Sequence, residues 1–317
     1  MRVVFMGSPE FAVPCLRALA SKHDVAFVVS QPDKPAGRGG QLTPPPVKAT
    51  AVDLGLPVIQ PKSARTGELE KALRESGAEL AAVVAYGKIL PRAVLEALPR
   101  GCINVHASIL PRYRGAAPVQ WAVIDGEHET GVAIMQLDEG MDTGPVLLEK
   151  RVAIDPDETS GELLARLAPI GAAALLEAIE LIASGRATPI AQDHAASTHA
   201  PMLTKADGAI DFTQPAPKVA ARIRGVDPWP GAQALLRGQI VKVFRARAAA
   251  GTSGAPPAGT VVAVDANGLH VACGDGGVVV IRDVQAPGRK RLTAAQFAAG
   301  RGVAIGDVLS KPELAGP

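Results

Sequence analysis

Short apolar runs and helix-like stretches alternate along the first half of the chain, and this alternation constrains the fold more than any other feature. The apolar runs are Arg2–Met6, Val25–Ser30, Val58–Ile59, Leu80–Tyr86 and Ile103–Ala107. The first helical stretch between them ends near Ser21. The others cover Val47–Leu54, Thr66–Ser76 and Pro91–Leu98. Such alternation is typical of βαβ units, in which helices connect parallel strands. We therefore predict an α/β domain with a mainly parallel sheet.

The turn after the first apolar run reads Gly7-Ser8-Pro9. Ser8 is suited to the N-cap of the following helix and Pro9 to its first position. The turn lacks the G-x-G-x-x-G pattern of dinucleotide sites, and the second run ends in Ser30 rather than in an acidic residue. We interpret it as a plain strand-to-helix turn, which weakens the case for a nicotinamide-dependent enzyme.

A long segment rich in proline and glycine, Gln31–Pro46, interrupts the alternation. Half of its positions are Pro or Gly, so it can hold neither a helix nor a central strand. We predict a long loop. Loops of this length inside a compact domain are usually functional or disordered.

The pattern changes beyond Asp125. Gly131–Leu137 and Pro145–Ile154 are apolar stretches that flank an acidic, glycine-containing turn, and they predict mixed strands at a sheet edge. Ser160–Ser184 has the apolar spacing of a long amphipathic helix, and the polar stretch Ala187–Met202 resembles a linker.

The last third of the chain carries a possible helix and then short β-like runs punctuated by turn residues. The runs are Ile240–Phe244, Thr260–Val264, Leu269–Ala272 and Val278–Ile281, after a helical stretch at Gln214–Gly225. Short strands at regular spacing predict a small β-barrel. The length of 317 residues also favours two domains.

Composition excludes several classes of protein. No apolar run approaches the roughly 18 residues of a membrane span, and the N-terminal apolar stretch breaks too early for a signal peptide. The three cysteines show no CxxC spacing, which argues against a disulfide framework or a structural zinc site. We expect a soluble, cytoplasmic protein without a membrane partner.

The net charge of +2 is unevenly distributed. Through Leu203 the chain has 19 Lys/Arg and 23 Asp/Glu, whereas from Thr204 onward it has 14 Lys/Arg and 8 Asp/Glu. A basic C-terminal part suggests a polyanionic partner, although ordinary surface charge would also explain it. Only 10 residues are aromatic, too few for a base-stacking platform.

One apolar run carries a polar pair that points to chemistry. Asn104 and His106 are two residues apart, so in a strand they lie on the same face, near the end where α/β sheets bind ligands. A carboxylate beside His106 would orient the imidazole and favour its protonated form. Asp138, Glu139 and Asp142 are the candidates, and spacing alone does not choose among them. The bland alternatives are a structural Asn/His pair and a solvated turn.

These residue types suggest proton-coupled group transfer by direct attack, because no Ser or Cys nucleophile sits in an obvious elbow. The six histidines show no HxH or HExxH spacing, so a metal is not expected.

Segments spread over nearly the whole chain carry a more specific signal. They read MGSPEFAVPCLRAL, QPDKPAGRGGQLTPPPVK, VVAYGKILP, INVHASILPRYRGAAPVQWAVIDG, ETGVAIMQLDEGMDTGPVL, VDPWPGA and KVF. Together they resemble the methionyl-tRNA formyltransferase family, most specifically at Asn104–Gly115 and Asp138–Gly144. The family commonly has Ser-Leu-Leu-Pro where this chain has Ser108-Ile109-Leu110-Pro111. Because Ile is similar in volume to Leu, we expect little effect on folate binding.

The resemblance implies an α/β fold with a Rossmann-like formyltransferase domain followed by a smaller OB-like β-barrel domain. The implied limits are 1–186 for the catalytic domain, 187–203 for a linker and 204–317 for a tRNA-binding domain. The implied reaction transfers the formyl group of 10-formyltetrahydrofolate to the α-amino group of methionyl initiator tRNA, for translation initiation. The expected partners are that tRNA and the folate, with no metal, and we expect a monomer.

Site residues carried over from the family fall into three groups. Asn104, His106 and Asp142 would be catalytic. The folate contacts would be Ser108, Ile109, Leu110, Pro111, Tyr86, Gly87 and Ile89. Arg38 and Lys34, in the Gln31–Pro46 loop, would contact the tRNA acceptor stem. Apart from the resemblance, the basic run Arg289-Lys290-Arg291 would add sequence-independent contacts to phosphates, although such a run is more often a solvated turn.

The chemistry of these residues agrees with the implied reaction. An α-amino group has a pKa of about 7.7–8.0, which an ester lowers further, so part of it is neutral and can attack. Attack on the formyl carbon creates an oxyanion, to which Asn104 and a protonated His106 could donate hydrogen bonds worth roughly 3–4 kcal/mol each. Asp142 would keep His106 protonated and help to move the proton of the amine.

Three rival functions remain open from the sequence. A related formyltransferase could act on a small amine, such as a ribonucleotide glycinamide or an amino sugar. A non-catalytic RNA-binding protein could use a degenerate enzyme domain, although the intact Asn104, His106 and Asp142 argue against it. A nicotinamide-dependent oxidoreductase would follow from fold class alone.

Overall fold

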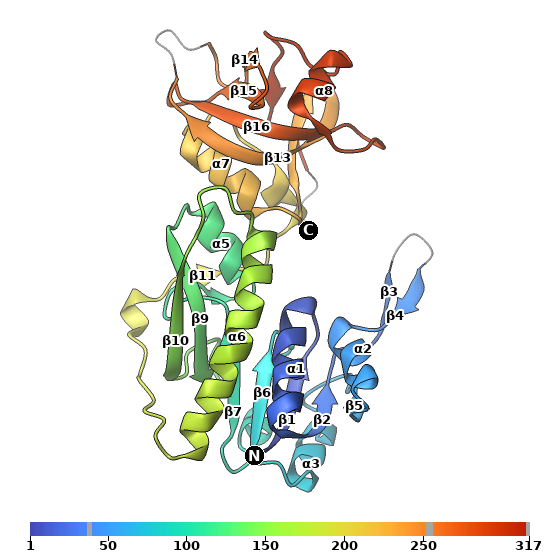
Figure 1. Cartoon of the computed structure of the whole chain (residues 1–317), viewed down its shortest axis with the longest axis vertical. Helices are drawn as coiled ribbons and strands as arrows, with labels where there is room; N and C mark the ends of the chain where they lie inside the picture. Colours follow the sequence, from blue (N-terminus) through green and yellow to red (C-terminus); the bar gives the residue numbers. More distant parts are fainter. Residues whose placement is uncertain (37–39, 252–255, 315–317) are drawn as a thin grey trace. The chain divides into compact units, whose positions relative to one another are not determined.

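The structure is a computed structural model, and it describes residues 1–36, 40–251 and 256–314 (Figure 1). The described chain packs into two compact units, each assembled from more than one segment. The first comprises Met1–Gly115, Thr130–Val152 and Leu164–His199, and the second Ala116–Glu129, Ala153–Leu163 and Ala200–Pro317. The limits 1–186, 187–203 and 204–317 stay a prediction about independently folding domains.

The first unit is built on a seven-stranded mixed sheet with the order β10-β9-β7-β6-β1-β2-β5. The strands are β1 (Arg2–Gly7), β2 (Asp24–Val29), β5 (Val58–Ile59), β6 (Leu80–Val84), β7 (Cys102–His106), β9 (Glu129–Gln136) and β10 (Val146–Ala153). The first five run parallel, and β9 is antiparallel to β7. The predicted α/β class, with mixed strands toward one edge, is confirmed.

The central strands are apolar on both faces because both faces are covered. Every residue of β6 is buried, as is every residue of β1 after Arg2. The connecting helices are α1 (Val13–Lys22), α2 (Pro46–Asp53), α3 (Glu68–Glu75), α4 (Arg92–Leu95) and α6 (Ser160–Ala183). At Gly171, α6 comes so close to β7 that a Cβ atom would lie 3.1 Å from Cγ1 of Val105.

The first helix begins later than the sequence predicts. Glu10–Ala12 forms the 3-10 turn η1, and α1 starts at Val13 with Ala12 as its N-cap. The Oγ atom of Ser8 instead accepts a hydrogen bond of 3.1 Å from the backbone N–H of Gln31. The predicted N-cap at Ser8 is therefore wrong, because its side chain ties together the segments that follow β1 and β2.

The Gln31–Pro46 segment contains more structure than a plain loop. Two short strands, β3 (Lys34–Ala36) and β4 (Gln41–Thr43), pair antiparallel with Lys34 opposite Thr43. They form a separate two-stranded sheet (Figure 1). Pro46 is already the first residue of α2, a position where its missing N–H costs nothing.

The second unit contains a curved antiparallel sheet with the order β14-β15-β16-β13-β12-β18, and β17 pairs with β16. Its strands are β12 (Ala232–Leu236), β13 (Gln239–Ala249), β14 (Val261–Val264), β15 (Leu269–Ala272), β16 (Val278–Gln285), β17 (Leu292–Thr293) and β18 (Leu309–Ser310). A bridge between Thr260 and Val308 joins the two ends. The ends can meet because Gly259 lacks a Cβ atom, which would lie 2.1 Å from the carbonyl oxygen of Leu309. The predicted small barrel is confirmed.

Three helices accompany the barrel: α5 (Pro118–Ile124), α7 (Ala216–Gly225) and α8 (Ala294–Ala299). Neither α5, α8 nor strand β12 was expected from the sequence. The α5 segment has only seven residues and no side-chain N-cap, so its local signal is weak. It packs on α7 at Gly225, where a Cβ atom would lie 2.4 Å from Cγ1 of Ile124.

The remaining global features concern membranes, metals and thiols. Within residues 1–36, 40–251 and 256–314, no helix has the length and apolarity needed to cross a membrane. In the same ranges, His, Cys, Asp and Glu side chains form no group of three or more that could hold a metal ion. All three cysteines are free and buried, and burial raises the pKa of Cys15 and Cys102 to about 12 and that of Cys273 to about 11.

Candidate active site

The candidate residues gather where two neighbouring parallel strands end. Strands β6 and β7 pair with Val83 opposite Asn104, so the segments after Val84 and after His106 leave the sheet at the same edge. In open α/β sheets, ligands bind at this carboxyl edge. The topology therefore brings the predicted folate residues of both segments to the same edge as the predicted catalytic strand.

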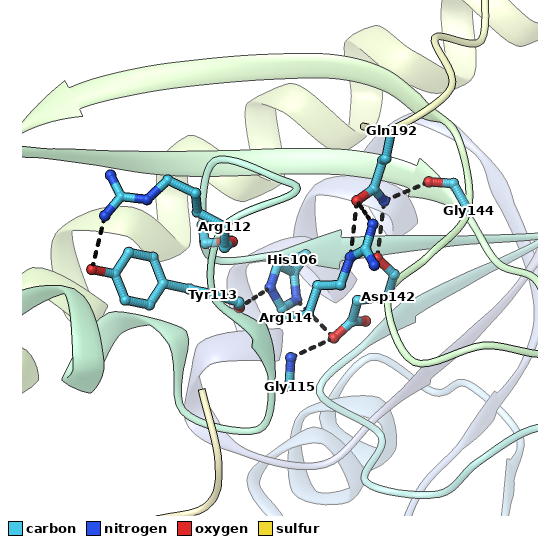
Figure 2. Close-up of polar contacts among 9 residues, drawn as sticks. His106, Arg112, Tyr113, Arg114, Gly115, Asp142, Gly144 and Gln192 are labelled. Atoms are coloured by element: carbon cyan, nitrogen blue, oxygen red, sulfur yellow. Dashed lines mark hydrogen bonds and ion pairs between the residues drawn. The ribbon is translucent and has the colours of Figure 1, made fainter. Parts of the chain in front are cut away.

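His106, the last residue of β7, is held from both sides of its ring (Figure 2). Its Nε2 lies 2.9 Å from the carbonyl oxygen of Tyr113, and its Nδ1 lies 3.6 Å from Oδ2 of Asp142. A carbonyl oxygen can only accept, so Nε2 carries a proton. The other ring nitrogen, Nδ1, faces the carboxylate of Asp142.

The 3.6 Å separation of Nδ1 and Oδ2 is longer than a hydrogen bond. The Nδ1 proton of an imidazolium would therefore stay available to a substrate oxygen, while the nearby negative charge stabilises the cation. Only 6% of the His106 side chain and 14% of the Asp142 side chain are exposed. The partial burial strengthens this electrostatic coupling relative to a surface pair.

The acidic loop resolves a choice that spacing left open. Asp142 is the carboxylate beside His106, and its Oδ2 also accepts a hydrogen bond of 2.9 Å from the backbone N–H of Gly115. Asp138 instead stabilises its own turn, because its Oδ1 accepts hydrogen bonds from Gly140 and from the hydroxyl of Thr143. Glu139 is exposed.

Backbone geometry shows why this loop has its glycines. A Cβ atom at Gly144 would lie 1.8 Å from the carbonyl oxygen of Gln136, so only glycine fits there. Asp142 has a φ of 54° and Tyr113 a φ of 59°, both in the left-handed region that side chains disfavour. Such conformations cost about 1–3 kcal/mol each and persist only where surrounding contacts impose them.

Asn104 is half-buried on the same strand as His106. Its side chain makes no hydrogen bond with any residue that the structure describes. An amide group on this face, two residues from His106, is therefore available to a ligand.

The segment after β7 holds the predicted folate residues Ser108, Ile109, Leu110 and Pro111. Ser108 is fully buried, and its hydroxyl donates a hydrogen bond of 2.7 Å to the carbonyl oxygen of Arg112. Leu110 packs in a small apolar cluster with Ala133 and Met135 of β9, and it precedes Pro111 through a cis peptide bond. The segment is thus a rigid, tightly folded turn.

The segment after β6 holds the other predicted folate residues. The ring of Tyr86 lies in the core, and its carbonyl oxygen accepts a hydrogen bond of 2.9 Å from the side chain of Gln31. Burial raises the pKa of the Tyr86 hydroxyl, which has no hydrogen-bond partner among the described residues. Gly87 has a φ of 77°, and the side chain of Ile89 is 68% exposed. This segment therefore presents bare backbone and one apolar side chain.

Two residues are predicted to contact the tRNA, Lys34 and Arg38. Lys34 is exposed on β3, whereas Arg38 lies outside the described residues. The base of the β3–β4 hairpin is fixed by Lys48, whose ammonium donates to Asp33 at 2.8 Å and to Gln60 at 2.8 Å. Hydrogen bonds from Lys48 and Gln60 lower the pKa of the Asp33 carboxyl.

Gln192 was not among the residues predicted from the sequence. It comes from the irregular stretch after α6, yet it is buried and forms hydrogen bonds with Asp142, Gly144 and Arg114 (Figure 2). Its partners are 48 to 78 residues away along the chain, so no local pattern marks it.

Comparison with known proteins decides the family. The family described as "Formyl transferase" matches residues 1–179, and "Formyl transferase, C-terminal domain" matches residues 202–302. The methionyl-tRNA formyltransferase of Sorangium cellulosum (strain So ce56) is 49% identical over 98% of this chain and 100% of its own length. That of Myxococcus xanthus (strain DK1622) is 48% identical over 99% of each chain. The chain belongs to the methionyl-tRNA formyltransferase family. It is a formyl-transferring enzyme.

Solved structures of other proteins share the fold at low sequence identity. The sugar 3N-formyl transferase WlaRD, solved in the presence of dTDP and 5-N-formyl-THF, has a TM-score of 0.68 and 17% identity, covering 92% of this chain and 99% of its own. HypX from Aquifex aeolicus, in complex with tetrahydrofolic acid, has a TM-score of 0.63 and 17% identity, covering 100% of this chain and 50% of its own.

Proposed function

We propose that this enzyme transfers the formyl group of 10-formyltetrahydrofolate to the α-amino group of methionyl initiator tRNA. The observation that carries the proposal is the His106–Asp142 pair at the carboxyl end of β7, with Nε2 fixed by the Tyr113 carbonyl and Nδ1 facing the carboxylate. The nearly full-length similarity to methionyl-tRNA formyltransferases supplies the acceptor.

The residues at the site are suited to different steps of a direct formyl transfer. The neutral α-amine attacks the formyl carbon, and the negative charge that develops on the formyl oxygen needs donors. Asn104, whose amide has no partner among the described residues, and the Nδ1–H of a protonated His106 are both suited to donate. Asp142 stabilises the imidazolium and accepts the proton that the amine loses. The tetrahedral intermediate then collapses, the bond between the formyl carbon and the folate nitrogen breaks, and that nitrogen takes up the proton as tetrahydrofolate leaves.

The two segments that follow β6 and β7 are suited to a folate. A fused, flat heterocycle needs a narrow slot lined by apolar groups and by backbone N–H and C=O groups. Gly87 offers bare backbone and Ile89 an exposed apolar side chain, while Ser108, Leu110 and Pro111 form a fixed turn on the neighbouring strand. These residues, with Ile109 and Tyr86, would bind the folate and supply no chemistry of their own.

The charge distribution agrees with a tRNA acceptor. In the second unit, several arginines are already paired with carboxylates: Arg222 with Asp207, Arg237 with Asp307, Arg245 with Glu162, Arg247 with Asp157, and Arg291 with Asp283. Arg291 also stacks 4.0 Å from the centroid of the Phe244 ring. Its neighbours Arg289 and Lys290 are exposed and form no ion pair with a described residue, so they are the members of that run available to phosphates.

Formyl transfer to charged initiator methionyl-tRNA, measured with 10-formyltetrahydrofolate as donor, tests the proposal. Free methionine and an amino sugar nucleotide compete as acceptors in the same reaction. We expect formylated tRNA to be the dominant product. Folate turnover with formylation of the small amine alone would support formyl transfer from the folate and exclude methionyl-tRNA as the acceptor.

A further inference from the structure

A short stretch of chain contacts both the segment after β7 and the acidic loop, which together surround the His106–Asp142 pair. The stretch is residues 190–198, here named the strap. It begins at Ile190, which bridges Val146 at the start of β10, and it ends at Thr198. Two backbone hydrogen bonds of 2.8 Å between Ile190 and Val146 fix its beginning.

The strap also holds the segment after β7 in place. The backbone N–H of Tyr113 donates to the hydroxyl of Thr198 at 2.8 Å, and that of Arg114 donates to the carbonyl oxygen of Thr198 at 2.9 Å. This segment supplies both backbone contacts that orient the catalytic pair: the Tyr113 carbonyl on His106 and the Gly115 N–H on Asp142.

Gln192 is the residue of the strap that joins this segment to the acidic loop (Figure 2). Its Nε2 donates to the carbonyl oxygens of Asp142 at 2.9 Å and Gly144 at 2.7 Å. Its Oε1 accepts from Nε of Arg114 at 3.1 Å and from Nη2 at 2.6 Å. Both donors and both acceptor sites of the carboxamide are used, and only this orientation pairs donors with acceptors.

We propose that Gln192 is a positioning residue that fixes Asp142 relative to His106 by clamping the acidic loop to Arg114. The loop needs such a clamp, because Asp142 adopts a left-handed backbone conformation with a φ of 54°. The carboxamide holds the main chain on both sides of the Asp142–Gly144 turn, and the Arg114 guanidinium anchors the carboxamide. Arg114 is itself buried and meets His194 of the strap at 3.1 Å. The inference rests on the proposed function, because it assigns the clamp a role in formyl transfer.

The variant Gln192→Glu separates positioning from stability. The new carboxylate would still accept the hydrogen bonds of Arg114 and would bind its guanidinium more strongly, so the strap should stay attached to the segment after β7. It removes both donors and places a negative oxygen against the carbonyls of Asp142 and Gly144, so the loop is released. We expect kcat for formyl transfer to fall about 100-fold, as for a catalytic group displaced by about 1 Å, with KM for tRNA and folate within about twofold. Gln296→Glu in α8 is the matched control, because Glu serves equally well in the capping box where Gln296 sits.

Amide hydrogen exchange, measured by NMR on the whole chain, shows whether the hydrogen bonds around Asp142 remain formed, and it does not depend on enzymatic turnover. In Gln192→Glu the N–H of Gly115, which donates to Asp142, should lose protection, whereas the N–H groups of Tyr113 and Arg114, which donate to Thr198, should keep theirs. Unchanged kcat together with unchanged Gly115 protection overturns the proposal. Loss of protection at all three amides also overturns it, because Gln192 would then be only a structural support. Should the wild-type enzyme fail to formylate methionyl-tRNA, the proposed function falls, and the exchange pattern still reports on the clamp.

Discussion

Replacing Asp142 with asparagine would remove the negative charge beside His106 and leave the shape of the His106–Asp142 pair intact. An asparagine oxygen can still accept the hydrogen bond of 2.9 Å from the Gly115 N–H, so the loop should keep its position. What changes is the interaction with a protonated His106, whose Nδ1 lies 3.6 Å from the carboxylate oxygen, and the ability of residue 142 to accept the proton of the amine.

The size of the expected effect follows from this distance and from the burial of the two groups. With an effective dielectric constant of about 20, opposite unit charges 3.6 Å apart attract by about 4–5 kcal/mol. The dipole of the new amide restores part of this energy, and each 1.4 kcal/mol corresponds to a factor of about ten in rate. We expect kcat/KM for formyl transfer to fall by about 100- to 1,000-fold.

The assay compares initial rates of methionyl-tRNA formylation by the wild type, by Asp142→Asn and by Asp138→Asn. The Asp138 variant makes the same chemical change in the same loop, but its carboxylate contacts only Gly140 and Thr143. We expect it to retain most of its activity, and thermal unfolding checks that both variants are folded. A rate for Asp142→Asn within threefold of wild type would refute the electrostatic role assigned to Asp142.

Four further outcomes are expected. His106→Ala should lower turnover by several orders of magnitude while the protein remains folded, and near-wild-type kinetics would remove His106 from the mechanism. Lys34→Ala should raise KM for tRNA and leave KM for the folate unchanged; equal effects on both would contradict a role in tRNA binding. Lys290→Ala should reduce the slope of log K against log salt for tRNA binding by about one, and an identical slope would exclude a phosphate contact. Hydrogen bonds from Arg237 lower the pKa of the Asp307 carboxyl, so this pair stabilises the fold above a pH of about 4 and ceases to do so as the pH falls below that value. The difference in unfolding free energy between wild type and Asp307→Asn should therefore shrink as the pH is lowered below about 4. A difference that stays constant with pH would disprove the stabilising role of the pair.

Much of the fold could be predicted because buried parallel strands leave a clear trace in the sequence. Leu80–Val84 is a run of five apolar residues, and each of them is buried. Helix α5 left little trace, because seven residues carry little periodicity and its place depends on packing against α7. The start of α1 was mispredicted because Ser8 bonds a residue 23 positions away instead of the helix that follows it.

For the candidate site too, the sequence predicted what depends on neighbouring residues and missed what depends on contacts between distant segments. Asn104 and His106 could be paired from the sequence because a strand places alternate residues on one face. The choice of Asp142 over Asp138 and Glu139 could not be made, because it depends on how Gly140 and Gly144 fold the loop and on the N–H of Gly115. Gln192 could not be predicted, since every partner of its side chain is at least 48 residues away along the chain.

The strap has a consequence for modular engineering of this enzyme. Residues 190–198 fall between the two ranges that match formyltransferase domains, 1–179 and 202–302. A catalytic portion cut at either 179 or 186 would keep Asn104, His106 and Asp142 and lose Gln192, the proposed clamp between the loop of Asp142 and Arg114. Exchanging the C-terminal barrel for one from another formyltransferase would therefore preserve the active centre only if the splice lies beyond Thr198. The stretch that looks like a spacer in the sequence thus belongs functionally to the active centre, and grafting experiments should treat it as part of the catalytic half.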